Sequence, residues 1–129
     1  MTIPGKPNII KDTTQFTYLA LGDSYTIGES VPYMVNFPNQ LVTTLKQTGY
    51  KVAAPDIIAR TGWTTDELTS AIMQRGLTQK FDFVTLLIGV NNQYRRYNIA
   101  SYQTEFVALL DTALKYANGN KDRVFVLSI

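Results

Sequence analysis

The sequence predicts an α/β domain built on a parallel sheet, and three observations support this prediction. Four apolar segments alternate with segments of helical periodicity, polar residues follow three of the apolar segments, and 45% of the residues are hydrophobic against 17% charged. Alternation of strands and helices implies right-handed crossovers, which place helices on both faces of a sheet. The length of 129 residues suits one domain, expected to span residues 1–129.

Each of the four apolar segments is predicted to be a strand. Their near-continuous apolar runs are typical of strands covered on both faces, as in a parallel sheet. Pro55 interrupts the second run. The predicted strands are residues 16–21, 52–59, 83–88 and 124–129.

Three amphipathic helices are predicted around these strands. The first begins at Pro38, because proline is favoured in the first turn, and ends at Gly49. The second opens with a capping box formed by Thr64 and Glu67. The third is the clearest, because its apolar residues recur at i, i+3, i+4 and i+7 before Gly119. Its apolar positions are Phe106, Leu109, Leu110, Ala113, Leu114 and Ala117.

The last predicted strand, residues 124–129, has no turn, cap or helix after it in the sequence. A buried strand of this kind needs neighbours on its edge and layers on both faces. We therefore expect the sequence to be the N-terminal part of a longer polypeptide, with a sheet that is incomplete on its C-terminal side. The alternative is a naturally short chain that ends in an edge strand.

Composition argues against several functional classes. The chain has no cysteine and no histidine, so it lacks the usual zinc ligands and forms no disulfide. The net charge is +2 and the basic residues are scattered, Arg95-Arg96 being the only adjacent pair, so no nucleic-acid partner is expected. Residues 1–11 contain no continuous apolar stretch, so neither a signal peptide nor a membrane span is predicted. A cytoplasmic location is the default expectation, and a secreted or periplasmic origin stays open.

Three loops that follow predicted strands carry the residues best suited to chemistry. They are residues 22–24, 60–63 and 89–92, and ligands of open α/β sheets bind outside the carboxyl ends of the strands. Acyl transfer needs a nucleophile and fixed donors aimed at a developing oxyanion. Ser24 offers the hydroxyl, while the backbone N–H groups of Ser24 and Gly62 and the carboxamide of Asn91 offer the donors. Asp23 is expected to organise the loop through local backbone N–H groups rather than to transfer a proton.

The chain resembles the SGNH hydrolases, also called GDSL lipases and esterases, in three of the family's four sequence blocks. Residues 18–26, Tyr-Leu-Ala-Leu-Gly-Asp-Ser-Tyr-Thr, are similar to the first block, with Tyr25 in place of the usual leucine. Gly62 matches the second block, and residues 89–91 match the third. Asn92 replaces the aspartate that typically follows, which leaves Asn91 in the oxyanion position. The fourth block, Asp-x-x-His, has no counterpart in these residues.

This resemblance implies a flavodoxin-like three-layer α/β/α sandwich and a serine ester hydrolase. Ser24 would be the nucleophile, and Gly62 and Asn91 would form the oxyanion hole. The resemblance further implies a small-molecule acyl ester as substrate and no metal or cofactor. The Asp and His are expected in a missing C-terminal segment, so these 129 residues alone are expected to be almost inert.

Aromatic and polar residues beside these loops are candidates for substrate contact. We expect Tyr25, Trp63, Asn92 and Tyr94 to line the substrate site, and Arg95-Arg96 to touch an anionic group. Ordinary surface packing, with arginine stems covering aromatic rings, explains the cluster equally well.

Two other functions are compatible with the pattern. Residues 24–28 loosely resemble the phosphate loop of a flavodoxin, which favours an FMN-binding electron carrier. The carboxylates of Asp23 and Glu29 beside that loop would repel a phosphate. The second alternative is a degenerate SGNH domain that has kept the fold and lost its general base.

Overall fold

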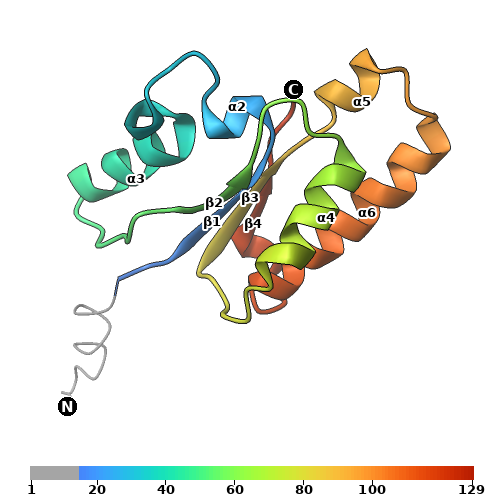
Figure 1. Ribbon diagram of the computed structural model, residues 1–129. Helices are drawn as coiled ribbons and strands as arrows, with labels where there is room; N and C mark the ends of the chain where they lie inside the picture. Colours follow the sequence, from blue (N-terminus) through green and yellow to red (C-terminus); the bar gives the residue numbers. More distant parts are fainter. Residues whose placement is uncertain (1–14) are drawn as a thin grey trace.

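The computed structural model describes residues 15–129 as helices packed on both faces of a sheet (Figure 1). The sheet has four strands, all parallel, in the order β2-β1-β3-β4. The strands are β1 (Tyr18–Gly22), β2 (Asp56–Ala59), β3 (Phe83–Leu87) and β4 (Val124–Val126). The predicted α/β class and parallel sheet are confirmed, while the expectation about residues 1–11 lies outside the described residues.

The register of β1 with its two neighbours aligns the ends of three strands. Gly22, the last residue of β1, lies opposite Ala59 of β2 and Leu87 of β3. Each of these partners is also the last residue of its own strand. The three segments that follow therefore leave the same edge of the sheet at the same level.

Helices α4 and α6 pack side by side on one face of the sheet, and α3 lies on the other (Figure 1). Two short helices that the sequence did not predict, α2 and α5, begin just after the carboxyl ends of β1 and β3. The helices are α2 (Ser24–Ile27), α3 (Phe37–Gln47), α4 (Thr65–Arg75), α5 (Val90–Tyr94) and α6 (Ile99–Tyr116), with the 3-10 turns η1 (Tyr33–Val35) and η2 (Lys121–Arg123). None of the helices in the described part of the chain combines the length and hydropathy needed to span a membrane.

Local capping signals in the sequence have the predicted effect. The N–H of Thr64 donates to Oε1 of Glu67 at 3.0 Å, which completes the capping box of α4. Helix α3 begins one residue before the predicted Pro38, because the side chain of Asn36 accepts the N–H of Asn39 at 3.1 Å. Proline then occupies the first turn, where its missing N–H leaves no hydrogen bond unmade.

The second and fourth strands are shorter than predicted. Pro55 has no N–H to donate, so β2 begins only at Asp56, and Val52 makes an isolated bridge with Phe16. The prediction of a fully buried strand over residues 124–129 is wrong for the described chain. Phe125 in β4 remains 49% exposed, because β4 pairs only with β3 and an apolar groove of about 690 Å³ lies over this part of the sheet.

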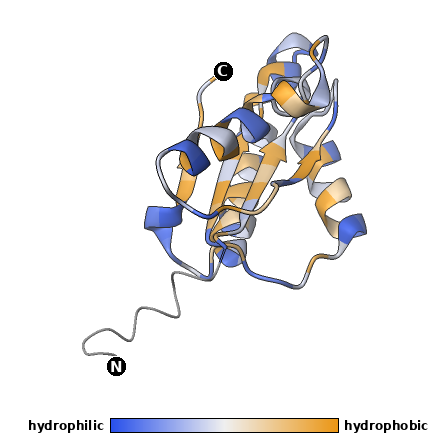
Figure 2. Ribbon diagram, turned by 90° about the vertical axis from the view of Figure 1, so that its left-hand side faces the viewer, coloured by the Kyte–Doolittle hydropathy of each residue, from blue (hydrophilic) through white to orange (hydrophobic). Residues whose placement is uncertain are grey.

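The hydrophobic core is divided unequally by the sheet, whose strands carry mostly apolar residues (Figure 2). The larger cluster fills the space between the sheet and helices α4 and α6. Its buried members are Leu19, Leu21, Ile58, Leu68, Ile72, Phe81, Val84, Leu86, Ile88, Leu109, Ala113 and Ala117. The smaller cluster lies under α3 and contains Tyr18, Ala20, Val42 and Val52. The α4 and α6 face therefore carries most of the packing that holds the sheet.

Leu109 offers a test of the packing on the α4 and α6 face, because it lies in α6 with 1% of its surface exposed. We expect Leu109→Ala to lower the free energy of unfolding by about 2–5 kcal/mol, the usual cost of a cavity in a packed core. Urea denaturation followed by circular dichroism measures the change. Val107→Ala is the matched control, since Val107 lies in the same helix and is 57% exposed. Equal losses in the two variants would contradict the assignment.

Candidate active site

The three loops predicted to carry chemistry leave the same edge of the sheet. Ser24 opens helix α2 after β1, Gly62 lies in the turn after β2, and Asn91 lies in helix α5 after β3. Because β1 lies between β2 and β3, Ser24 follows the central strand of the three. All three residues are half-buried.

Asp23 organises the turn that presents Ser24. Oδ1 of Asp23 accepts the N–H of Tyr25 at 3.0 Å, and the Asp23 carbonyl accepts the N–H groups of Thr26 and Ile27. Asp23 is thus the N-cap of α2, and it binds a local backbone N–H group as the sequence analysis expected. Its position holds the backbone of Ser24 at the first residue of the helical turn.

The second oxygen of Asp23 is buried without a hydrogen-bond partner among residues 15–129. Burial raises the pKa of the Asp23 carboxyl above its usual value, and the hydrogen bond from the Tyr25 N–H opposes this rise only in part. The ionised form is therefore less favourable in the folded protein than in the unfolded chain.

This shift predicts how Asp23→Asn changes stability with pH. Because the folded state holds the Asp23 proton more tightly, the ionised carboxylate lowers stability progressively as the pH rises from the unfolded pKa through the folded pKa. Asparagine keeps the Oδ1 acceptor and carries no charge. The free energy of unfolding of the variant should therefore rise relative to that of the wild type over this pH interval, and the difference should persist at neutral pH. Urea denaturation at a series of pH values from acid to neutral measures the difference.

Asp111→Asn, on the exposed side of α6, shows what removal of a surface carboxylate does over the same pH series. A difference between Asp23→Asn and wild type that shrinks as the pH rises would contradict the prediction.

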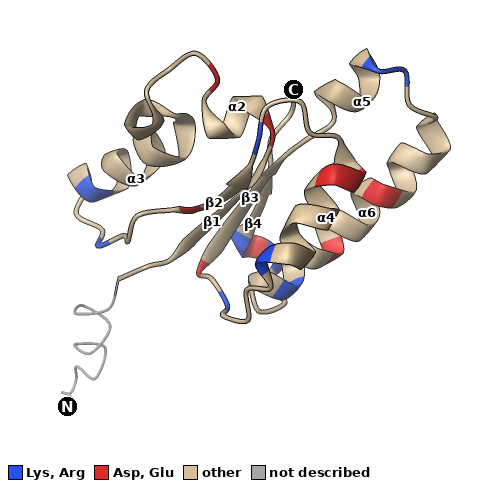
Figure 3. Cartoon of the chain, viewed as in Figure 1, with Lys and Arg blue, Asp and Glu red and all other residues tan. Residues whose placement is uncertain are grey.

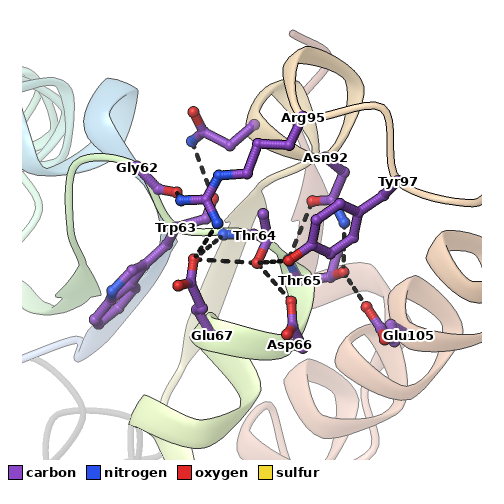
Figure 4. A network of polar contacts seen from close by, with 11 residues as sticks. Gly62, Trp63, Thr64, Thr65, Asp66, Glu67, Asn92, Arg95, Tyr97 and Glu105 are labelled. Carbon is purple, nitrogen blue, oxygen red and sulfur yellow. Dashed lines mark hydrogen bonds and ion pairs between the residues drawn. The ribbon is translucent and has the colours of Figure 1, made fainter.

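Helix α5 and its C-cap residue, Arg95, bind two successive carbonyl groups of the turn after β2. Nη2 of Arg95 donates to the Gly62 carbonyl at 2.6 Å (Figure 4). Nδ2 of Asn91 donates to the Trp63 carbonyl at 3.0 Å. Nη1 of Arg95 also lies 3.5 Å from Oε1 of Glu67 in α4. Gly62 has a φ of 89°, a conformation that favours glycine, so these contacts hold the most permissive residue of the turn in one geometry.

A second set of contacts joins α5 to the start of α4. Oδ1 of Asn92 accepts the N–H of Thr65 at 3.1 Å, and Nδ2 of Asn92 donates to Oγ1 of Thr65 at 2.9 Å. The Thr65 hydroxyl in turn donates to Glu105 of α6 (Figure 4). Residues of three helices, α4, α5 and α6, therefore meet in one polar cluster.

The predicted substrate-contact residues differ in exposure. Tyr25 and Tyr94 are 59% and 85% exposed, and Trp63 is half-buried against the larger core cluster. Asn92 is only 3% exposed, and both polar atoms of its side chain bind Thr65. Tyr25, Trp63 and Tyr94 stay candidates for contact with substrate, whereas the side chain of Asn92 is buried and bound to Thr65.

The two arginines of the Arg95-Arg96 pair differ in their surroundings. Arg95 binds groups of the protein itself, and Arg96, with a φ of 59°, follows it in the exposed segment after α5. Figure 3 shows basic residues in this segment and acidic residues near the start of α4 and along α6. The contacts of Arg95 and Glu105 were not predicted from the sequence, because their partners lie 33 and 40 residues away and no local pattern marks such pairs.

Arg95→Met tests whether α5 holds the turn. Loss of the guanidinium should increase hydrogen–deuterium exchange of the amides in residues 61–64 by roughly threefold to tenfold, the effect of about 1 kcal/mol for a partly exposed charged contact. Arg96→Met makes the same chemical change one residue later and serves as the control. Equal protection of residues 61–64 in Arg95→Met and wild type would show that other contacts hold the turn.

The fold and the site together define an open parallel α/β protein with a serine at the end of a central strand. The chain belongs to the GDSL-like lipase/acylhydrolase family, whose model matches residues 20–127. This match confirms the resemblance on which the sequence interpretation rested. Among curated proteins, none is similar enough in sequence to match.

Solved structures share the fold at low sequence identity. AlinE4, described as an SGNH-hydrolase family esterase, superimposes with a TM-score of 0.73 at 20% identity, covering 88% of this chain and 58% of that one. TesA gives 0.75 at 21% identity, with 88% and 60% covered. The psychrotrophic esterase EstA from Pseudoalteromonas sp. gives 0.64 at 15% identity, with 88% and 58% covered. The chain therefore spans only about three fifths of the length of these structures.

Proposed function

We propose that the complete polypeptide hydrolyses small or medium acyl esters with Ser24 as its nucleophile. The observation that carries this proposal is the shared edge of β1, β2 and β3, which brings the segments of Ser24, Gly62 and Asn91 to one side of the sheet. Membership of the lipase/acylhydrolase family supports the same reaction class. The substrate is a small-molecule acyl ester, and the mechanism needs no metal or cofactor.

In this mechanism the Ser24 Oγ attacks the ester carbonyl while a general base takes its proton. The backbone N–H groups of Ser24 and Gly62 and the Asn91 carboxamide stabilise the oxyanion. Nδ2 of Asn91 carries two hydrogens, and the one donated to the Trp63 carbonyl leaves the other for the oxyanion. The base then protonates the departing alcohol, and water releases the acid from the acyl-enzyme.

The general base of this reaction is proposed to be a histidine oriented by an aspartate in a segment outside these 129 residues. The sequence contains no histidine. The chain also spans about three fifths of the length of similar esterase structures. Without the histidine, turnover should be lower by on the order of a millionfold, as in other triads that lose their base.

The geometry of residues 24–28 favours this reaction over binding of a flavin phosphate. A phosphate loop needs free backbone N–H groups. Here the N–H groups of Tyr25, Thr26, Ile27 and Gly28 all donate to oxygens of Asp23 or Ser24. These four N–H groups are therefore already bound within the turn and are not free to bind a phosphate.

Labelling by a fluorophosphonate tests the nucleophile. In the complete polypeptide the probe should label Ser24, and Ser24→Ala should abolish labelling and reduce ester hydrolysis by on the order of a millionfold. Asn91→Ala should reduce kcat by roughly a hundredfold to a thousandfold, the usual effect of one lost oxyanion donor. Peptide mass mapping and p-nitrophenyl ester hydrolysis provide the measurements.

Ser101→Ala is the matched control, because Ser101 is an exposed serine of α6 and does not follow a strand of the sheet. Full hydrolysis by Ser24→Ala would refute the proposal. A complete polypeptide that neither reacts with the probe nor hydrolyses esters would favour the degenerate domain.

A further inference from the structure

A network of hydrogen bonds links α6 to Asn92, the residue that follows the candidate oxyanion donor Asn91. Glu105 of α6 accepts the Thr65 hydroxyl, and Thr65 makes two hydrogen bonds with Asn92 of α5. Thr65 is 0% exposed and Asn92 is 3% exposed. Water therefore cannot easily replace the two bonds between Thr65 and Asn92, and these two residues depend on each other for their partners.

The direction of every bond in this network is determined by chemistry. The backbone N–H of Thr65 can only donate, so the atom of Asn92 that faces it is Oδ1. Nδ2 of Asn92 then faces Oγ1 of Thr65 and donates to it. The single hydroxyl hydrogen of Thr65 is left for Glu105, which accepts it.

This network of hydrogen bonds limits the motion of helix α5 at the position of Asn91. Asn92 follows Asn91 directly, so anchoring the Asn92 side chain restricts rotation of the short helix α5. The Asn91 carboxamide is held in turn at the Trp63 carbonyl, one residue after Gly62. The approach of α6 is also close at the start of α5, where a Cβ on Gly89 would lie 2.7 Å from the Tyr102 hydroxyl.

We propose that Glu105 is a positioning residue for the Asn91 carboxamide and acts through Thr65 and Asn92. This inference rests on the proposed function, because it concerns the orientation of an oxyanion donor. It gives the asparagine at position 92 a specific role: its Nδ2 supplies a donor that an aspartate lacks. With a carboxylate at position 92, the one hydroxyl hydrogen of Thr65 would face two acceptors, and two negative charges would share one buried group.

The test is a reciprocal exchange of the amide and the carboxylate. In Asn92→Asp, kcat for p-nitrophenyl butyrate should fall by roughly tenfold to a hundredfold, the effect of a slightly misplaced catalytic group. KM should stay within about twofold, since ground-state binding is not changed. Glu105→Gln alone should retain kcat within about threefold, because the glutamine Oε1 still accepts the Thr65 hydroxyl.

The double variant Asn92→Asp with Glu105→Gln should restore kcat to within about threefold of wild type. In that variant the aspartate accepts both the N–H and the hydroxyl of Thr65, while the glutamine amide donates to Thr65 Oγ1. Combining Asn92→Asp with Asp111→Asn is the matched control, because Asp111 is an exposed carboxylate of the same helix. This control should keep the defect of Asn92→Asp.

The outcomes distinguish a role of Glu105 in positioning Asn91 from a role in stability alone. If the double variant is as slow as Asn92→Asp, or if Asp111→Asn rescues equally well, the proposal is overturned. It is also overturned if urea denaturation shows loss and recovery of stability while kcat does not change.

A failure of the proposed function is recognised independently, by full hydrolysis in Ser24→Ala. In that case the positioning role of Glu105 is tested in the polypeptide of residues 1–129, by NMR of the ¹H–¹⁵N signals of the Asn91 side-chain amide. These signals should move in Asn92→Asp and return in the double variant. An Asn91 amide that does not respond would overturn the positioning role.

Discussion

The candidate site depends on the parallel register of β1 with both of its neighbours. Because Gly22 lies opposite Ala59 and Leu87, the first three strands end together, and the segments that follow them share one edge. The packing of α4 and α6 against these strands buries the larger of the two hydrophobic clusters. Burial of the core and convergence of the site are therefore consequences of one arrangement.

Polar contacts add to the register by joining the segments at this edge of the sheet. Arg95 and Asn91 bind consecutive carbonyls of the turn after β2, and Asn92 binds the first residue of α4. These contacts have different environments. Arg95 and Glu67 are partly exposed and screened by water, whereas Thr65 and Asn92 are buried and cannot exchange partners with water. The buried contacts therefore tolerate fewer changes of donor and acceptor than the exposed ones. The exposed Arg95 further restrains Gly62, whose carbonyl it binds.

The two faces of the sheet are not equivalent. The face under α4 and α6 is closely packed, while an apolar groove of about 690 Å³ lies between α3 and β4 on the other. Its lining includes Phe83, Phe125 and Leu127, the last of which is 38% exposed. The contacts of the α5 segment run to the turn after β2 and to the start of α4, which is the closely packed side of the sheet.

The α/β class, the order of the main elements and the loops that contain Ser24, Gly62 and Asn91 could all be predicted from local sequence patterns. This is because apolar runs, capping residues and glycines act over a few residues, and the capping box of Thr64 and Glu67 shows this directly. The short helices α2 and α5, the exposure of β4 and the contacts of Arg95 and Glu105 were decided by the tertiary structure. Partners 33 to 40 residues apart meet only when strands and helices pack, so no local pattern announces them.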